Sequence, residues 1–361
     1  MTAVSDGRPA RVTGLDVARA LALFGMFAAH IANAGMYGPG GWRWLVATHG
    51  RSSALFAVLA GVSIALMLTR SSAADPVRHT RVRVAVRAVL LIFLGWALEA
   101  LGTPVDVILD NLGVMFLLVL VAFRWRPWVL LGLGAVILCV GRDVLQPLVD
   151  HLPTWFYDLP VIHELWGIHY PALIWVGYVL IGMGLGKLAP WRGQALGWLA
   201  ASGLLLAVLA YGTGAWTLAA NGEPIVWGDS WGESDAWYQI AAHSYTAFEM
   251  LGNVGVACAV IALCCFVARV LPRVTWPLAA AGSMTLTLYT AHIVMIAIAG
   301  AGIVFEPTNA AWLALCAACL LFASVWRWRV GQGPLEGVFT SASTALANID
   351  AVWRARVSGP V

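Results

Sequence analysis

Charge is scarce in this sequence. Asp, Glu, Lys and Arg make up 11% of its 361 residues and hydrophobic residues 61%, whereas a globular protein carries about 25% charge. A chain with a mean hydropathy of +0.82 cannot cover its surface with polar atoms, so much of that surface must face membrane hydrocarbon. The low charge therefore excludes a soluble protein and predicts an all-α, polytopic membrane protein.

Cysteine and glycine also lack informative patterns. All six cysteines lie in apolar runs, which is not the arrangement of a disulfide framework, and the 37 glycines follow no collagen-like period. His163, Glu164 and His169 are joined by no cysteine and lack the two-histidine helical spacing of a zinc protease, so we expect no metal. Gly182 and Gly186, four residues apart, instead indicate close helix packing.

Apolar runs of membrane-spanning length, which is about 20 residues, recur along the chain. We find no removable signal peptide before the first run, which we expect to remain as a signal anchor, and no internal repeat that would divide the single domain 1–361. The runs predict ten transmembrane helices, at roughly 15–35, 51–69, 84–102, 104–123, 127–145, 170–188, 194–215, 246–270, 275–300 and 309–326.

Basic residues are distributed unevenly between the two sides that these spans define. All but three of the 21 Lys and Arg residues fall on one side, the exceptions being Arg43, Arg51 and Arg142. The positive-inside rule makes this side cytoplasmic, and an even number of spans places both termini there. The outer side then carries two longer loops, about 142–169 and 216–245, and long loops often carry function.

Ionisable residues inside a span are costly, which makes each one a functional candidate. In the first span, steps of three and four place Asp16, Arg19, His30 and Asn33 on one helical face. Asp16 and Arg19 are close enough to pair, and His30 lies roughly 16 Å further across the membrane at about 1.5 Å per residue. This face suits catalysis or ligand binding; the alternative is a capping ion pair plus a histidine that bonds a neighbouring helix.

A second membrane histidine, His292, lies in the ninth span, near its outer end. It shares a helix face with Thr285 and Tyr289, and the topology brings it to a depth similar to that of His30. Two histidines at one depth suggest a common cavity, and the alternative is a packing histidine satisfied by tyrosine or threonine.

Further candidates stand at the outer ends of other spans. Arg51 enters the second span among small polar residues close to His49, where it suits an acidic or polyhydroxyl ligand, although interfacial snorkelling explains it equally well. Four more polar residues near the outer ends are Asp106, Asp110, Asn111 and Glu249.

Four stretches of the sequence carry a resemblance to a known family. They are residues 11–26 (RVTGLDVARALALFGM), 50–63 (GRSSALFAVLAGVS), 282–292 (GSMTLTLYTAH) and 333–336 (GPLE). They are similar to YeiB-like bacterial proteins, which are related to heparan-α-glucosaminide N-acetyltransferase. Arg19 and His30 also have a spacing similar to the Arg-x10-His motif of membrane acyltransferases that decorate surface glycans.

The resemblance implies a transmembrane acyltransferase that takes an acyl group, expected to be acetyl, from cytoplasmic acyl-CoA and delivers it to an acceptor at the outer face. A membrane histidine, His30 or His292, would act as base or acyl carrier. The glucosaminide enzymes are similar in having Asn at the His30 position and a His about eleven residues later, where this chain has Gly41 and Trp42. His30, His49 and His292 therefore all stay open as the proton acceptor.

Binding residues follow from the chemistry of the two substrates. The phosphates of CoA require arginine on the cytoplasmic side, where we expect Arg19, oriented by Asp16, together with Arg81, Arg83 and Arg87; the positive-inside rule explains the last three equally well. The residues expected on the acceptor side are Asn33, His49, Arg51 and Tyr289.

Two other functions stay open at this point. A transporter or lipid flippase could use Asp16, Arg19 and His30 as a proton or substrate path, although paired helix breaks typical of transporters are not evident. A non-catalytic scaffold or sensor on the same fold is the other. The expected partners are membrane lipid and a glycan or glycolipid acceptor, and a homodimer is an open alternative. We expect no binding of nucleic acid. Abundant Arg and Ala suggest the cytoplasmic membrane of a high-GC bacterium.

Overall fold

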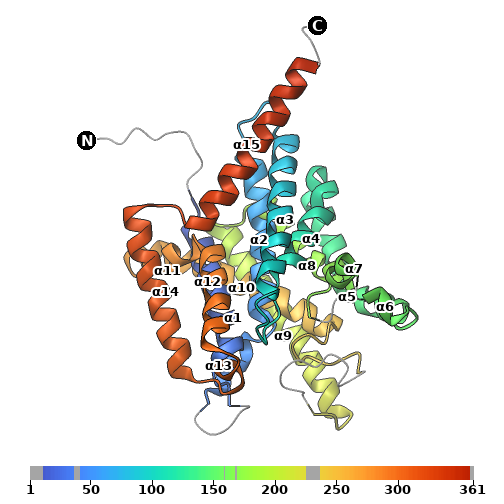
Figure 1. Ribbon diagram of the computed structural model, residues 1–361. Helices are drawn as coiled ribbons and strands as arrows, with labels where there is room; N and C mark the ends of the chain where they lie inside the picture. Colours follow the sequence, from blue (N-terminus) through green and yellow to red (C-terminus); the bar gives the residue numbers. More distant parts are fainter. Residues whose placement is uncertain (1–10, 36–40, 158, 167–168, 225–235, 358–361) are drawn as a thin grey trace.

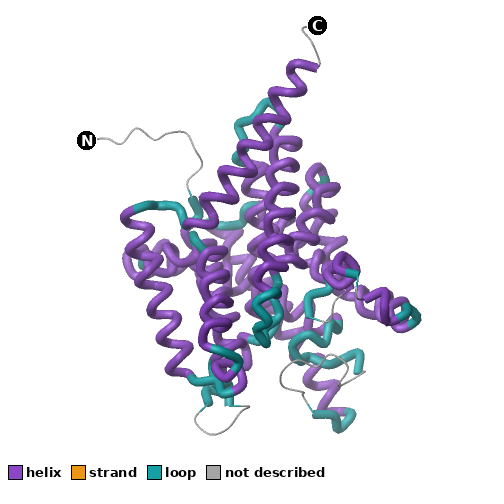
Figure 2. The backbone as a smooth tube through the Cα atoms, viewed as in Figure 1, coloured by secondary structure: helices purple, strands orange, loops and turns teal. Residues whose placement is uncertain are grey.

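The computed structural model describes residues 11–35, 41–157, 159–166, 169–224 and 236–357. Within these ranges the chain is helical and has no β-strand (Figures 1 and 2). The helices are α1 (Thr13–Ile31), η1 (Arg43–Thr48), α2 (Arg51–Thr69), α3 (Pro76–Glu99), α4 (Leu109–Leu118), η2 (Val119–Arg124), α5 (Pro127–Asp150), α6 (Thr154–Tyr157), α7 (Pro160–Trp166), α8 (Ala172–Leu188), α9 (Gly193–Ala220), α10 (Ala247–Val270), α11 (Pro272–Gly282), α12 (Thr285–Ala299), α13 (Gly302–Phe305), α14 (Asn309–Arg329) and α15 (Pro334–Val357), where η marks a 3₁₀ helix.

Helices occupy every predicted span, although they differ in how well they suit a membrane. In the described part of the chain, six are long and apolar enough to cross one: α1, the η1–α2 segment, α5, α9, α10 and α14. The bent pair α11 and α12 makes a seventh if it counts as one span. The chain is thus an all-helical protein with several membrane-spanning helices.

Several boundaries differ from the sequence prediction. The predicted span 275–300 is broken, because α11 ends at Gly282 and α12 continues from Thr285 at an angle of 64°. In the predicted span 104–123, α4 has only ten residues and is followed by the 3₁₀ helix η2. The predicted loop 142–169 is largely helical, since α5 continues to Asp150 and α6 and α7 follow.

Two predicted features lie partly or wholly outside the described residues. Residues 225–235 of the predicted loop 216–245 lie outside them, and α9 occupies the start of that loop. The side chain of His163 also lies outside them.

Side-chain caps determine where some of the helices begin. Asp75 precedes α3 and accepts a hydrogen bond from the backbone N–H of Arg78 at 3.1 Å, while Pro76 occupies the first turn, where its missing N–H costs nothing. The Thr246 hydroxyl likewise accepts from the N–H of Glu249 at 3.2 Å and starts α10. These caps satisfy amide groups that a helix leaves unpaired at its first turn.

Glycines allow α2 and α8 to cross in contact. A Cβ atom on Gly182 would overlap the backbone carbonyl of Val58, and one on Gly61 would overlap that of Val179. Gly186 meets the side chain of Ala65 in the same way. The prediction of close packing at Gly182 and Gly186 is therefore confirmed, because small residues let two membrane helices approach each other at backbone distance.

The C-terminal helix α15 was not predicted. In Figure 1 it extends beyond the rest of the bundle beside the first half of α3. Arg78 of α3 forms two hydrogen bonds of 2.6 Å to the Asp350 carboxylate, and its guanidinium lowers the pKa of Asp350. Because α15 mixes polar and apolar residues, it contains no long apolar run, and this is why hydropathy did not detect it.

The bundle has two ends that matter for function. We call the upper end in Figure 1 the basic end; there α1 begins, α2 ends, and Arg11, Arg70 and Arg83 lie around one cavity. We call the other the histidine end; there α1 finishes, and His30 and His243 line another cavity.

Candidate functional site

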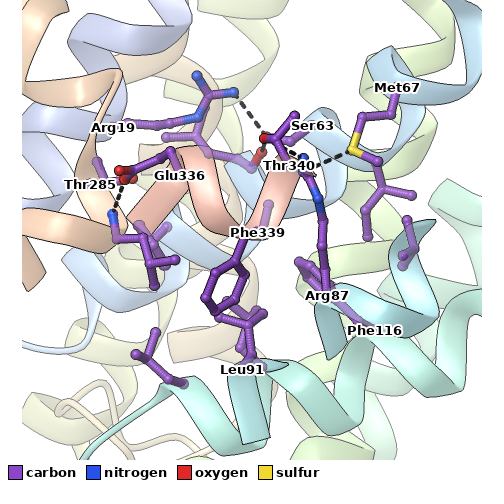
Figure 3. Close-up of a pocket in the computed structure, with 18 residues that line it drawn as sticks. Arg19, Ser63, Met67, Arg87, Leu91, Phe116, Thr285, Glu336, Phe339 and Thr340 are labelled. Atoms are coloured by element: carbon purple, nitrogen blue, oxygen red, sulfur yellow. Dashed lines mark hydrogen bonds between the residues drawn. The ribbon is translucent and has the colours of Figure 1, made fainter. Parts of the chain in front are cut away.

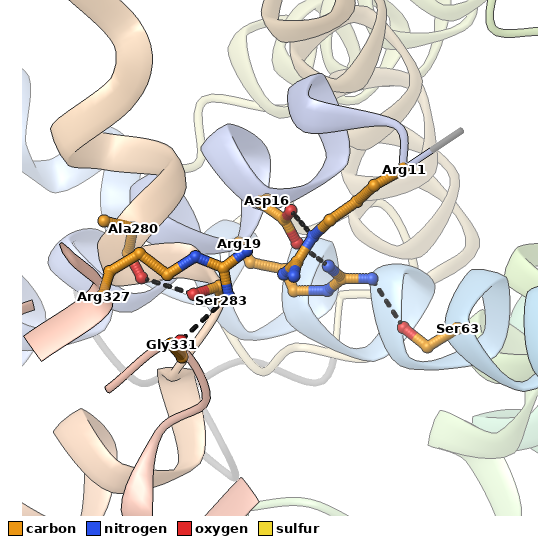
Figure 4. Close-up of polar contacts among 8 residues, drawn as sticks. All are labelled: Arg11, Asp16, Arg19, Ser63, Ala280, Ser283, Arg327 and Gly331. Carbon is orange, nitrogen blue, oxygen red and sulfur yellow. Dashed lines mark hydrogen bonds and ion pairs between the residues drawn. The ribbon is translucent and has the colours of Figure 1, made fainter. Parts of the chain in front are cut away.

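The polar face of α1 begins with a buried carboxylate at the basic end. Asp16 is 3% exposed and accepts hydrogen bonds from Arg11 and Arg19, each at 2.5 Å (Figure 4). The second amino group of Arg19 donates to the Ser63 hydroxyl of α2 at 2.9 Å. Asp16 therefore holds Arg19 in one orientation, as the i, i+3 spacing predicts.

Two cavities adjoin at Arg19, Ser63 and Met67, which line both. One cavity, of about 410 Å³, is rich in arginine. The other, of about 200 Å³, lies beneath α15 and is mainly apolar (Figure 3). The larger cavity is completed by Arg11, Val12, Leu15, Asp16, Leu66, Arg70 and Arg83, and the smaller one includes Phe56, Leu59, Ile64, Leu91, Leu112, Phe116 and Phe339.

The N-terminal part of α15 closes the smaller cavity. Phe339 projects into it from α15, as Figure 3 shows. Glu336 accepts hydrogen bonds from the backbone N–H groups of Leu286 at 2.7 Å and Thr287 at 3.2 Å, at the start of α12. A carboxylate is favourable at a helix N-terminus, so Glu336 fixes α15 at the break between α11 and α12.

The three arginines predicted on α3 occupy different places. Arg83 lines the larger cavity. Arg87 lines the smaller one and donates to Thr340 of α15 at 3.1 Å. Arg81 lies over the Phe123 ring, 6.0 Å from its centroid, and lines neither cavity.

The two membrane histidines are in direct contact. His30 Nδ1 of α1 and His292 Nε2 of α12 are 3.0 Å apart, and their rings stack with centroids 5.2 Å apart. His292 is fully buried against Phe27, whereas His30 is partly exposed. The sequence placed these residues at one depth, and the structure joins them by a hydrogen bond.

Hydrogen bonding determines which nitrogen of His30 is basic. His292 Nδ1 lies 2.7 Å from the carbonyl oxygen of Tyr289. A carbonyl only accepts, so this nitrogen carries the proton, and Nε2 of the neutral His292 ring accepts from Nδ1–H of His30. The remaining nitrogen, His30 Nε2, is then the basic one, and His30 lines the cavity at the histidine end.

That cavity has a volume of about 250 Å³ and is lined by several titratable side chains. His169 Nδ1 lies 3.2 Å from an oxygen of Asp106, which makes a polar pair at its edge. Its lining consists of Met26, Ala29, His30, Thr48, His49, Gly50, Ser53, Pro104, Val105, Asp106, His169, Tyr170, His243, Val304 and Phe305.

Of the four predicted acceptor-binding residues, only His49 lines this cavity. Tyr289 is buried and its hydroxyl accepts from the N–H of Ile108 at 3.3 Å. Asn33 accepts from the N–H of Gly35 at 2.8 Å. Arg51 lies over the Tyr211 ring at 4.6 Å from its centroid. In this conformation the latter three make these contacts and do not line the cavity; their role in binding the acceptor stays a prediction.

The histidine pair lies between the two cavity systems. Leu286 of α12 lines the smaller cavity of the basic end, and His292 lies six residues further along the same helix, about 9 Å at 1.5 Å per residue. Tyr289 and His292 pack together on this part of α12, with ring centroids 5.1 Å apart. A short buried segment of α12 thus separates the apolar cavity from the cavity that His30 lines.

Two family models match the chain. Residues 191–345 match a family of proteins of unknown function, DUF418, and residues 11–220, more than half of the chain, match the catalytic domain of heparan-alpha-glucosaminide N-acetyltransferase. The chain belongs to the heparan-alpha-glucosaminide N-acetyltransferase family. The resemblance seen in the sequence is confirmed, and the family is of the membrane acetyltransferase type. No curated protein matches the chain in a sequence comparison.

The candidate site of this acetyltransferase-family chain contains residues from both matched regions. Arg19 and His30 lie in the first, whereas His292 and Glu336 lie in the second. The sequence analysis did not identify His169, Tyr170 or His243 as residues of this cavity. No spacing links them, because His169 and Tyr170 are adjacent and His243 comes from a distant segment of the chain.

Proposed function

We propose that this chain is a membrane acyltransferase that moves an acyl group, acetyl in the first instance, from acyl-CoA on the cytoplasmic side to a hydroxyl or amine of a glycan or glycolipid at the outer face. The observation that carries the proposal is the His30–His292 pair, situated between cavities at opposite ends of the bundle. Membership of an acetyltransferase family supports the reaction type.

The cavities of the basic end fit the two parts of acyl-CoA. Guanidinium groups bind phosphate oxygens through charge-assisted hydrogen bonds, and Arg11, Arg19, Arg70 and Arg83 line the larger cavity. The smaller, mainly apolar cavity suits the flexible arm and the acyl group. Arg19 lines both, so it marks where the charged and uncharged parts of the donor would meet.

The topology of the proposal follows the distribution of charge. All ten predicted ranges cross a bacterial cytoplasmic membrane, and both termini are cytoplasmic. The basic end, with its arginine-rich cavity, then faces the compartment that contains CoA. The histidine end faces outward, where glycans and glycolipids are found.

The histidine pair supplies the chemistry. The basic Nε2 of His30 attacks the thioester carbonyl, a C–N bond forms, and the C–S bond breaks. His30 Nδ1–H passes its proton to His292 Nε2, which holds it while His30 carries the acyl group, and the departing CoA thiolate takes a proton from water on the cytoplasmic side. The acceptor then takes the acyl group from His30, and the histidine is restored. Burial of His292 excludes water from this proton path.

Isotope exchange without an acceptor tests the proposal. Purified protein is incubated with acetyl-CoA and labelled CoA, and label is expected in acetyl-CoA because His30 accepts and returns the acetyl group. A transporter or flippase catalyses no such exchange. A protein that neither binds acetyl-CoA nor exchanges the label, yet moves a solute across liposomes, would sink the proposal.

Two arginines on α3 provide a matched test of the donor site. Arg83→Gln is expected to raise the Kd for acetyl-CoA about 10- to 100-fold, because it removes one charge-assisted hydrogen bond to phosphate. Arg81→Gln, which removes the same charge two residues away on the other side of α3, is expected to change the Kd less than about twofold, since Arg81 faces Phe123. Calorimetric titration in detergent measures both values, and equal effects would contradict this placement of the phosphates.

A further inference from the structure

The segment before α10 has an unusual backbone. His243 and Tyr245 have φ angles of 58° and 54°, in the left-handed region that side chains with a Cβ rarely adopt. Neither residue is glycine, and only Ser244 separates them. Such strain persists only where surrounding contacts enforce it, and it is concentrated at functional sites.

Glu249 provides the contacts that hold this segment. Its carboxylate is 2% exposed and accepts from the backbone N–H groups of His243 at 3.2 Å and Tyr245 at 2.8 Å. It also accepts from the Ser244 hydroxyl at 3.3 Å and from the Asn253 side chain at 3.0 Å. A capping glutamate normally reaches back to one backbone amide. Here one carboxylate binds two amides that flank Ser244, and it thereby fixes the left-handed turn.

The turn places the His243 ring at the cavity of the histidine end. His243 lines that cavity together with His30. Its Nδ1 lies 3.0 Å from the carbonyl oxygen of His169 and 3.2 Å from the Tyr245 hydroxyl, which itself donates to the same carbonyl. Nδ1 therefore carries the proton, and Nε2 is the basic nitrogen of the neutral ring. The Trp175 ring stacks beside His243 at a centroid distance of 6.0 Å and helps to fix its orientation.

We infer that His243 is a second catalytic residue of the proposed acyltransferase: the base that takes the proton from the acceptor while His30 holds the acyl group. The inference rests on the proposed function. It assigns different tasks to two histidines of one cavity, since His30 is coupled to His292 and the donor, and His243 is held by the turn that Glu249 fixes.

The acceptor step balances with these groups. The acceptor oxygen or nitrogen forms a bond to the acyl carbon, and the bond from that carbon to His30 Nε2 breaks. The acceptor proton moves to His243 Nε2, His292 Nε2 returns the first proton to His30 Nδ1 as the ring departs, and His243 then releases its proton to water at the outer face. No oxidant, reductant or further co-reactant is needed.

The substitution His243→Gly separates the chemistry from the fold. Glycine adopts a φ of 58° without steric cost; this gain offsets part of the stability lost with the buried His243 ring, so the variant is expected to fold. Transfer of label from acetyl-CoA to non-protein material in inverted membrane vesicles is expected to fall about 100-fold or more. Exchange of labelled CoA into acetyl-CoA is expected to continue at the parental rate, because it requires only His30 and His292.

Chemical rescue and a control histidine complete the experiment. Added imidazole is expected to raise the transfer rate of His243→Gly at least tenfold, since it supplies the missing base. A purely structural role of His243 would not produce this rescue. The control His151→Gln changes an exposed histidine that bonds Pro147 and should leave both reactions unchanged.

The outcomes distinguish this inference from the function on which it rests. Parental transfer in His243→Gly, an equal loss of exchange and transfer, or a transfer defect that imidazole does not restore would each overturn the role of His243 alone. A parent protein that shows neither exchange nor transfer would overturn the proposed function, and the inference would fall with it.

Discussion

Replacement of His30 by alanine is expected to abolish acyl exchange and transfer, lowering both by about 10²- to 10⁴-fold. The reason is geometric: His292 Nδ1–H donates to the Tyr289 carbonyl, His292 Nε2 accepts from His30 Nδ1–H, and His30 Nε2 is left as the basic nitrogen. No other side chain contacts His292 Nε2 in the described hydrogen bonds. The measurement is exchange of labelled CoA into acetyl-CoA, with vesicle transfer measured in parallel.

Binding distinguishes a lost reaction from a lost donor site. The Kd for acetyl-CoA should change little in His30→Ala, because the arginine-rich cavity lies at the other end of α1. His292→Gln is expected to slow exchange as well, since it removes the proton acceptor for His30 Nδ1. If His30→Ala exchanged CoA at the parental rate, or lost activity only through weaker donor binding, the role given to the histidine pair would be wrong.

A leucine at Gly182 is expected to prevent folding of the bundle. Its Cβ would overlap the backbone carbonyl of Val58, and a backbone atom cannot rotate away as a side chain can. Forcing α2 and α8 apart costs about 3 kcal/mol or more at such a contact, a large fraction of the 5–15 kcal/mol typical of a protein's stability. Size-exclusion chromatography and thermal unfolding in detergent should show little monodisperse protein.

The matched control is Gly132→Leu. Gly132 is also a helical glycine, in α5, but no atom lies within 4 Å of a Cβ built on it. This variant should elute and unfold like the parent, because the new side chain extends into open space. Similar behaviour of the two leucine variants would contradict the backbone-distance crossing of α2 and α8.

Hydropathy and helical spacing predicted the features that depend on local sequence. Apolar runs located helices throughout the ten expected ranges, and the i, i+3 spacing identified the Asp16–Arg19 pair. The count of spans and the side on which the termini lie stay predictions, because fewer than ten helices among the described residues are long and apolar enough to span a membrane.

Features that depend on contacts between distant segments could not be predicted in this way. His30 and His292 were expected at one depth, but a depth does not specify which helices touch. At the α11–α12 break, the first amides of α12 are bound by Glu336, a residue from a helix with no apolar run. The orientation of His243 depends on a left-handed turn whose carboxylate comes from the following helix. None of these contacts between distant segments can be predicted from the spacing of residues in the sequence.

The separation of the histidine pair along the chain bears on the order of synthesis. His30 and His292 are 262 residues apart, so most of the chain must emerge from the ribosome before the second histidine exists. Asp16 and Arg19 lie on one helix, so α1 can neutralise its own charge as it enters the bilayer. His30 acquires its partner only when α12 inserts. The proposed acyl carrier therefore gains its hydrogen-bond partner near the end of assembly, after most of the surrounding bundle has been made.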